Sequence, residues 1–324
     1  MLIEVKHRRG SRRGGVAPGP SALPTGPDTQ TRLARAPTEL LPRSLPPAPA
    51  WLRGCVESRI SEAMANLRPG NRRHTGVHAA RRTMRQARAA INLARSDLGA
   101  PAKDFERRLK QACRTLSALR DAHATVAAWD RFRGKQKRVE DAALDAQICR
   151  VLVARRRRIL AESLQRDPDL ARLRARLHDL AATVAALPWS NLRLVSIGAG
   201  LRRSLRRAGK ARHDIRGTNA AARHRWRRRL RLANQQRSIV AALACALFPG
   251  KSMPAGKANP LRLPGAKAER QAVRAVRALG REQDLRMLRR AVSSLAIATG
   301  PRRRLMRRIE RARLDAIGEF DKRR

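Results

Sequence analysis

Aromatic residues are almost absent from this chain, although its apolar residues are plentiful. Of the 324 residues 42% are hydrophobic, yet there is no tyrosine and there are only four Phe and four Trp. A hydrophobic core must therefore be built mainly from Ala, Leu, Val and Ile. Strands draw on aromatic and β-branched side chains, whereas Ala and Leu favour helices, so the composition predicts an all-α fold.

The charge of the chain is strongly one-sided. Lys and Arg number 74 against 25 Asp and Glu, which gives a formal net charge of +49, and only ten of the basic residues are Lys. Such a charge repels itself in the compact state unless anions gather around it. The planar guanidinium of Arg can hold two phosphate oxygens at once, whereas Lys acts as a point charge. The composition therefore indicates a polyanionic partner and leaves phosphates, nucleic acid and an anionic membrane open; a solvated, arginine-biased surface is the alternative.

The cysteines and the longest apolar run indicate the cellular compartment in which the protein is expected to lie. Four cysteines lie far apart and form no CxxC pair, namely Cys55, Cys113, Cys149 and Cys245. This spacing argues against a zinc site and against a disulfide scaffold, and it favours free thiols in a reducing compartment. The apolar run Ser238–Phe248 is too short to cross a bilayer, and the N-terminus lacks a signal-peptide apolar region. We expect a cytoplasmic protein without a membrane span, a metal or a cofactor.

Composition and periodicity divide the chain into three parts. Residues 1–50 hold nine of the eighteen prolines and show no helical periodicity, so this segment is predicted to be disordered. Two helical bundles in series follow, 51–190 and 191–324, separated near Pro188-Trp189. Asp167, which precedes Pro168, is predicted to cap a helix. The predicted helices are Trp51–Leu67, Arg73–Asp97, Pro101–Phe132, Gln136–Leu164, Pro168–Leu187, Gly200–Gly209, His213–Phe248, Lys267–Ala298 and Pro301–Phe320.

A histidine followed by regularly spaced arginines occurs once in each half. The two copies are His78-Ala-Ala-Arg81-Arg-Thr-Met-Arg85-Gln-Ala-Arg88 and His224-Arg-Trp-Arg227-Arg-Arg-Leu-Arg231-Leu-Ala-Asn234. At 3.6 residues per turn, offsets of 3, 7 and 10 residues fall within an arc of roughly 80° on one helical face. The strip from His78 to Arg88 is about 15 Å long at 1.5 Å per residue, which suits a chain of phosphates better than a single phosphate.

A second motif is also repeated, further along each half. Leu116-Ser-Ala-Leu-Arg120-Asp121 matches Leu279-Gly-Arg-Glu-Gln283-Asp284. In the same register Arg107 and Arg114 match Arg270 and Arg277, so that each pair is spaced i, i+7 on one helical face. We interpret Asp121 and Asp284 as structural residues that pair with an arginine or cap a helix. The repeats indicate a duplicated unit whose four basic faces could converge on one groove.

Together these motifs resemble the CHAD family, the conserved histidine α-helical domain. The matching segments are Val77-His78-x-x-Arg81-x-x-x-Arg85-x-x-Arg88, Leu116–Asp121, Gly200-Leu201-Arg202-Arg203, the His224 copy and Leu279-Gly280 with Asp284. Their order and doubling, from Trp51 to the C-terminus, are what make the set specific. The resemblance implies two four-helix bundles related by a pseudo-two-fold axis. It also implies binding of inorganic polyphosphate in a central basic channel, and for some members a location at polyphosphate granules.

The resemblance also indicates which residues would line that channel. Carried over by position, they are His78, Arg81, Arg85, Arg88, His224, Arg227 and Arg231, and the second repeat adds Arg107, Arg114, Arg270 and Arg277 as candidates. Asn234 stands where the family usually has Arg, and Gln235 where it usually has Tyr, so one charge is missing on that side. Histidine side chains have an ordinary pKa near 6.5, so binding should strengthen as the pH falls toward about 6.

Two other classes of function remain to be weighed. Nucleic acid, and structured RNA in particular, is the main alternative partner, but proteins that read single strands stack bases on aromatic side chains, which are scarce here. An enzyme acting on polyphosphate would need carboxylates that hold Mg²⁺. The closest acidic group is Glu140, Asp141 and Asp145, on a presumed outer helix. No Ser/His/Asp set or phosphate-cradling glycine loop is found, and the interval between His74 and His78 lacks the Glu of a zinc-protease helix. We therefore predict a binding protein rather than an enzyme.

Overall fold

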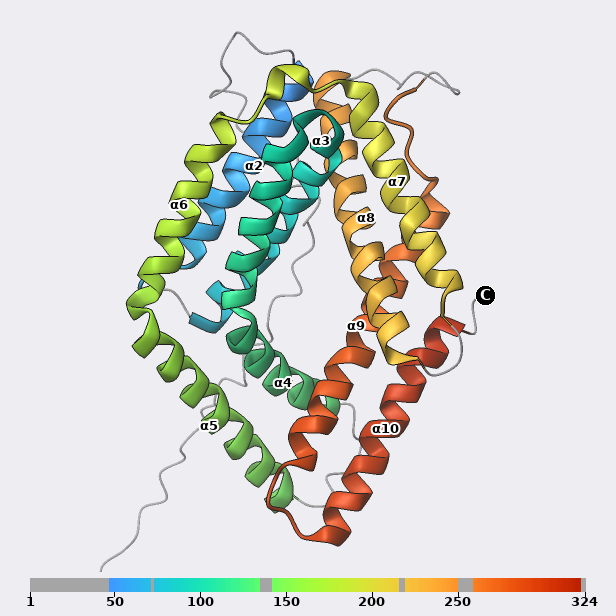
Figure 1. Cartoon of the computed structure of the whole chain (residues 1–324). Helices are drawn as coiled ribbons and strands as arrows, with labels where there is room; N and C mark the ends of the chain where they lie inside the picture. Colours follow the sequence, from blue (N-terminus) through green and yellow to red (C-terminus); the bar gives the residue numbers. More distant parts are fainter. Residues whose placement is uncertain (1–46, 71–72, 135–141, 216–218, 250–258, 322–324) are drawn as a thin grey trace, which may run out of the picture.

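The protein is described by a computed structural model that covers residues 47–70, 73–134, 142–215, 219–249 and 259–321 (Figure 1). These residues form nine α-helices and two short 3-10 turns and no strand, which confirms the predicted all-α class. The helices are α2 (Pro47–Asn66), α3 (Arg73–Thr115), α4 (Ser117–Gly134), α5 (Ala142–Arg166), α6 (Ala171–Ala185), α7 (Leu194–His213), α8 (Ala220–Leu247), α9 (Ala266–Ser293) and α10 (Thr299–Asp321). The 3-10 turns are η2 (Pro168–Leu170) and η3 (Trp189–Asn191).

The helix bounds correct the sequence-based prediction in three places. The predicted disorder of residues 1–50 is wrong at its end, because α2 begins at Pro47 and buries Ala48 and Ala50; residues 1–46 lie outside the described residues. The helix expected to run from Pro101 to Phe132 is broken at Leu116, between α3 and α4. His213, expected to begin a helix, instead ends α7.

Helix α3 is two helical segments joined at Gly99. This glycine has φ 62° and ψ −140°, a conformation that side chains other than glycine adopt only with strain. The second segment then begins at Pro101, as predicted, because a proline in the first helical turn sacrifices no hydrogen bond. The chain turns back on itself, and Asn92 on the first segment donates a hydrogen bond of 3.3 Å to Glu106 on the second.

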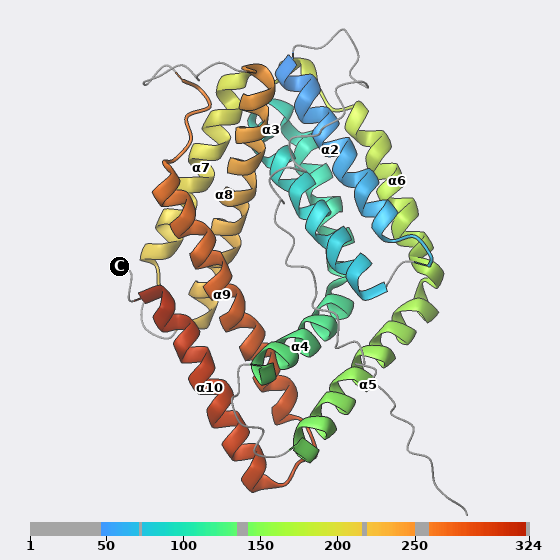
Figure 2. The same ribbon diagram turned by 180° about the vertical axis from the view of Figure 1, so that it is seen from behind.

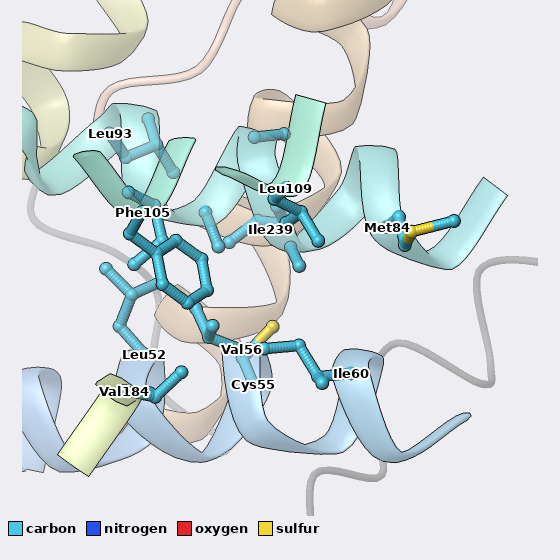
Figure 3. Packing of buried hydrophobic residues seen from close by; sticks show 14 of the residues in the cluster. Leu52, Cys55, Val56, Ile60, Met84, Leu93, Phe105, Leu109, Val184 and Ile239 are labelled. Atoms are coloured by element: carbon cyan, nitrogen blue, oxygen red, sulfur yellow. The ribbon is translucent and has the colours of Figure 1, made fainter. Parts of the chain in front are cut away.

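The largest hydrophobic cluster joins α2, both segments of α3, α6, α7 and α8. In both views α2, α3 and α6 lie side by side, and α7 and α8 lie together beside them (Figures 1 and 2). Figure 3 shows its central packing, in which Phe105 and Leu109 of α3 meet Leu52 and Val56 of α2. This cluster holds α3 and α8, which carry the two histidine–arginine repeats, in contact with each other.

A second cluster fills the opposite end of the molecule. It combines α4 and α5 with α9 and α10, and Trp129 and Ile148 lie in it together with Leu288 and Ile309. A third cluster joins α7, α8 and α9 around Trp226. The first two clusters therefore contain residues from both sides of residue 190, and the division into bundles of 51–190 and 191–324 stays a prediction.

Three polar features fix the helices relative to one another. The buried carboxylate of Glu282 in α9 lies 3.7 Å from Arg223 of α8 and 3.2 Å from Arg313 of α10. Gln236 of α8 donates a hydrogen bond of 3.2 Å to the carbonyl of Ala89 in α3. Asp167, predicted to cap a helix at Pro168, instead precedes the 3-10 turn η2, and the N-cap of α6 is Leu170; the Asp167 carboxylate nevertheless accepts hydrogen bonds from the backbone amides of Arg172 and Leu173 in α6. Across the described ranges, no helix is both long enough and apolar enough to span a membrane.

Candidate functional site

The two histidine–arginine repeats face each other across the contact between α3 and α8. Met84 and Ala87 of the first copy and Leu230 and Ala233 of the second are buried in the hydrophobic clusters. Because each basic strip lies beside its buried stripe, the packing of those apolar residues brings the arginines toward the interior. The four arginines that meet there are Arg81 and Arg85 of α3 and Arg227 and Arg231 of α8.

Arg85 and Arg231 form the most unusual pair of charges in this group. Burial, together with the positive charges of neighbouring arginines, lowers the pKa of Arg85 to about 10 and that of Arg231 to about 9. Among the residues that the structure describes, neither guanidinium forms a hydrogen bond or an ion pair, and Nε of Arg85 is buried. Two cations, one from each copy, are thus drawn away from water without an anion to balance them.

Arg81 and Arg227 occupy equivalent places and are held in equivalent ways. Arg81 donates to the backbone carbonyl of Cys113 and, at 3.2 Å, to the hydroxyl of Ser117. Arg227 donates to the side chain of Gln283 and lies over Gly280, where a Cβ would come 3.2 Å from its Nη2. Ser117 and Gly280 hold the same position in the second repeated motif, so a small residue makes room for the arginine in both copies.

Arg120 of α4 completes the group, which we call the arginine cluster: Arg81, Arg85, Arg120, Arg227 and Arg231. The charge of Arg120 lowers the pKa of all four other members, so it lies close to both strips. Sequence reasoning did not select Arg120 as a site residue. The sequence did contain a reason to select Arg120, because this residue belongs to the repeated motif Leu116–Asp121, at the position that Gln283 takes in the second copy.

The two aspartates of the second motif have structural partners, as expected. Asp121 lies 2.9 Å from Arg120, and Asp284 of α9 lies 2.8 Å from Arg131 of α4. Asp121 also raises the pKa of Arg81, although burial outweighs it, and Asp284 has the same effect on Arg227. These carboxylates therefore balance part of the charge at the edge of the cluster and leave its centre positive.

Arg88 lies further along α3 and differs from the arginines of the cluster. Its guanidinium is 3.7 Å from Glu106, a carboxylate that also lies 3.8 Å from Arg95. Arg88 is therefore partly neutralised within the protein. Asn234, at the corresponding place on α8, is half-buried and brings no charge, so the strip on α8 ends at Arg231.

The two histidines of the repeats lie in different surroundings. His78 is exposed to solvent although many protein atoms surround it, whereas His224 is half-buried and lies 3.1 Å from Gln283. The pKa of each is lowered, first because surrounding protein excludes water and then because neighbouring arginines repel a further proton. Each imidazole is therefore protonated less readily in the free protein than an ordinary histidine.

The arginines predicted from the second repeat do not join this group. Arg107, Arg114, Arg270 and Arg277 are all exposed. Arg107 forms an ion pair with Asp104 on its own helix, and its side chain is 71% exposed. Their role in binding stays a prediction. Arg202 of the α7 motif donates a hydrogen bond of 3.3 Å to the backbone carbonyl of Pro260 and so has a structural partner.

Clusters of acidic residues, histidines or cysteines are the arrangements that would hold a metal ion in the described part of the chain. No group of three or more His, Cys, Asp or Glu is arranged to hold a metal ion within it. Glu140 and Asp141 lie outside the described residues, and Asp145 is half-buried on α5. All four cysteines are free, and burial raises the pKa of the Cys113 thiol beside the arginine cluster, which keeps it protonated and unreactive.

Comparison with known proteins identifies the fold. No family model and no curated protein sequence matches the chain. Two solved structures match it, each at 18% sequence identity. The CHAD domain from the plant Ricinus communis matches with a TM-score of 0.52 over 86% of both chains. PptA from Streptomyces chartreusis matches with a TM-score of 0.57 over 84% of this chain and 96% of that protein. The resemblance indicated by the repeated motifs is thus confirmed at the level of structure, and this chain has the fold of the CHAD domain.

Proposed function

We propose that the protein binds inorganic polyphosphate, without catalysis, through the arginine cluster. The observation that carries this proposal is the pair Arg85 and Arg231, two desolvated guanidinium groups without an acid partner among the described residues. A protein that holds such charges in the absence of a ligand bears an energetic cost, which a polyanion at the same place would offset. Guanidinium groups hold phosphate oxygens two at a time, which makes phosphate the anion that best fits.

The arrangement favours a chain of phosphates over a single one. Five arginines from α3, α4 and α8 gather in one place, and the strip continues along α3 to Arg88. A linear polyanion places a charge at each step, so that it can engage guanidinium groups on both repeats at once. We further propose that the two halves are related by a pseudo-two-fold axis with the cluster as a central basic channel, and that the protein associates with polyphosphate granules in the cytoplasm.

The scarcity of aromatic residues favours polyphosphate over RNA as the ligand. Base recognition depends on stacking, and each stacked base contributes about 1–3 kcal/mol. The side chains that we place in the cluster are all arginines, which favour the phosphate backbone over the bases. RNA should therefore bind, if at all, as a polyanion and without base preference.

A pair of double variants tests the proposal. The first double variant combines Arg85→Gln with Arg231→Gln and removes the two unbalanced charges. The second, a control, combines Arg155→Gln with Arg157→Gln and removes two exposed charges from α5. Charged hydrogen bonds contribute about 1.5–3 kcal/mol each, so the first variant should lose at least about tenfold in affinity for long-chain polyphosphate by calorimetry. The second should lose less than about threefold, and both should keep their helical circular dichroism.

Two results would contradict the proposal. Equal loss of affinity in the two double variants would mean that binding depends on diffuse surface charge rather than on the cluster. Tighter binding of tRNA than of polyphosphate, compared at equal phosphate concentration and equal salt, would make nucleic acid the partner.

A further inference from the structure

A group of imidazoles lies next to the arginine cluster, where α3, α4 and α5 meet. The rings of His74 in α3 and His123 in α4 are stacked, with centroids 5.6 Å apart and planes 2° from parallel. His78 follows His74 by one helical turn, and its pKa is lowered by the charges of both Arg85 and His123, after the larger effect of burial. His78 therefore lies between the stacked pair and the cluster.

The surroundings of the stacked histidines are almost entirely cationic. From α5, Arg156 lowers the pKa of both His74 and His123, in addition to the larger effect of burial. The charges of Arg82 and Arg85 of α3 and of Arg120 of α4 act on His78. The acids near this group are Asp130, which raises the pKa of His123, Asp169 of η2, which is paired with Arg73, and Asp121 of α4, which is paired with Arg120. Without an anion, all three histidines remain mostly neutral at pH 7.

Two polar atoms of this group are buried without a partner in the described structure. They are Nδ1 of His123 and Nε of Arg156. A buried polar atom that lacks a hydrogen-bond partner costs roughly 1–3 kcal/mol, so such atoms usually indicate a missing ligand or water. Here both atoms belong to residues that bind phosphate well when charged, and they come from two different helices.

We propose that His74, His123 and Arg156 form a second phosphate subsite, which continues the arginine cluster past His78 and takes up protons when a polyphosphate chain occupies it. This inference rests on the proposed function and extends it to a part of the protein that the histidine–arginine repeats do not include. The ligand class is the same linear polyphosphate, long enough to extend from Arg85 and Arg231 to the stacked histidines.

The proton uptake follows from electrostatics. Phosphate bound among the arginines cancels the positive field that keeps the histidines neutral, and it favours the imidazolium form directly. The histidine pKa values are therefore higher in the complex than in the free protein. Protons are taken up on binding at any pH between the free and bound values, and by linkage the affinity rises as the pH falls through that range.

Calorimetry can count these protons. Long-chain polyphosphate is titrated into the full-length protein at pH 6.5 in two buffers of different ionisation enthalpy, and the difference in heat gives the protons taken up. Two double variants are compared. The first combines His74→Gln with His123→Gln. The control combines His178→Gln with His213→Gln and so changes two exposed histidines on α6 and α7. The first variant should take up fewer protons than the wild type, by roughly one per protein, and its affinity at pH 6 should fall at least about threefold. At pH 8 its affinity should match that of the wild type.

Chain length provides the second readout. Tripolyphosphate is too short to occupy both groups, so its affinity at pH 6 should be the same in the His74/His123 variant and in the wild type. Unchanged proton uptake and unchanged long-chain affinity in this variant would refute the subsite and leave the arginine cluster as the whole site. Absence of any binding heat in the wild type would instead refute the proposed function itself.

Discussion

Arg85 and Arg231 carry their charges at a place where water is largely excluded, and no carboxylate among the described residues pairs with them. Natural proteins usually pair such charges, because an unpaired buried ion costs several kcal/mol. Elsewhere in this fold, arginines form ion pairs with neighbouring carboxylates: Arg88 pairs with Glu106, and Arg131 pairs with Asp284. At the residue scale, the described carboxylates therefore pair with arginines around the cluster and not with Arg85 or Arg231.

Removing one of these charges should stabilise the unliganded protein. Arg231→Met keeps the length of the side chain and removes the desolvated cation, so the free energy of unfolding at pH 7 should rise by about 1–3 kcal/mol in urea denaturation. Arg206→Met on the exposed surface of α7 is the control and should change stability by less than about 0.5 kcal/mol. A large loss of stability in Arg231→Met would mean that the guanidinium is structurally required.

The same residue has a signature in the pH dependence of stability. The pKa of Arg231 is about 9 in the folded protein, against an ordinary value of 12.5. Between these values the unfolded chain binds more protons, so stability rises with pH. From pH 8 to pH 10, the free energy of unfolding of the wild type should therefore rise relative to that of Arg231→Met. If the difference between the two free energies stays constant over this range, the lowered pKa is contradicted.

The sequence allowed part of this site to be predicted. The offsets from His78 and His224 were enough to select Arg81, Arg85, Arg227 and Arg231, because helical periodicity determines which face they share. It could not show which helix would approach that face. Arg120 was missed for this reason, and the exposed positions of Arg107, Arg114, Arg270 and Arg277 could not be distinguished from buried ones.

At the scale of helices, α3 and α7 approach each other closely at Gly200. A Cβ at this position would lie 2.5 Å from the carbonyl oxygen of Leu93, which belongs to the backbone of α3 and cannot move aside cheaply. The glycine therefore permits the contact that joins the two halves beside the arginine-bearing helix.

A pair of glycine substitutions on one helix tests this contact. Gly200→Ala should destabilise the protein by about 2–4 kcal/mol, because the helices must separate and lose packing. Gly209→Ala, on the same helix with open space around it, should stabilise by roughly 0.5–1 kcal/mol through helix propensity. Thermal unfolding of both variants gives the comparison; a neutral Gly200→Ala would show that α7 can shift without cost.

The helices themselves were largely predictable, and their ends less so. Apolar periodicity indicated a helix in each place where one is found. The helical segments before and after Gly99-Ala100-Pro101 were correctly predicted as separate. The break at Leu116, a fully buried residue, has no glycine or proline to mark it in the sequence. The start of α2 was missed because Pro47 and Pro49 suggested disorder, although prolines are accepted in the first turn of a helix.

At the scale of the whole molecule, the net charge of +49 governs how strongly the protein responds to salt. Each phosphate that binds releases condensed counterions, so the logarithm of the affinity should fall linearly with the logarithm of the salt concentration. For the wild type and polyphosphate, we expect a loss of at least about 100-fold between about 50 and about 200 mM NaCl. The Arg85/Arg231 double variant should show a shallower slope by fluorescence titration, and identical slopes would place the contacts elsewhere.

The cluster around Trp129 and Ile309 has a consequence for how the protein is made. Its first two helices emerge from the ribosome more than a hundred residues before the α9–α10 pair that covers them. Until translation is nearly finished, the apolar side chains of α4 and α5 that contact α9 and α10 lack those partners, although α4 and α5 can already pack against each other. The nascent chain therefore passes through a long interval in which this surface is open to chaperones, and only the last helix closes it.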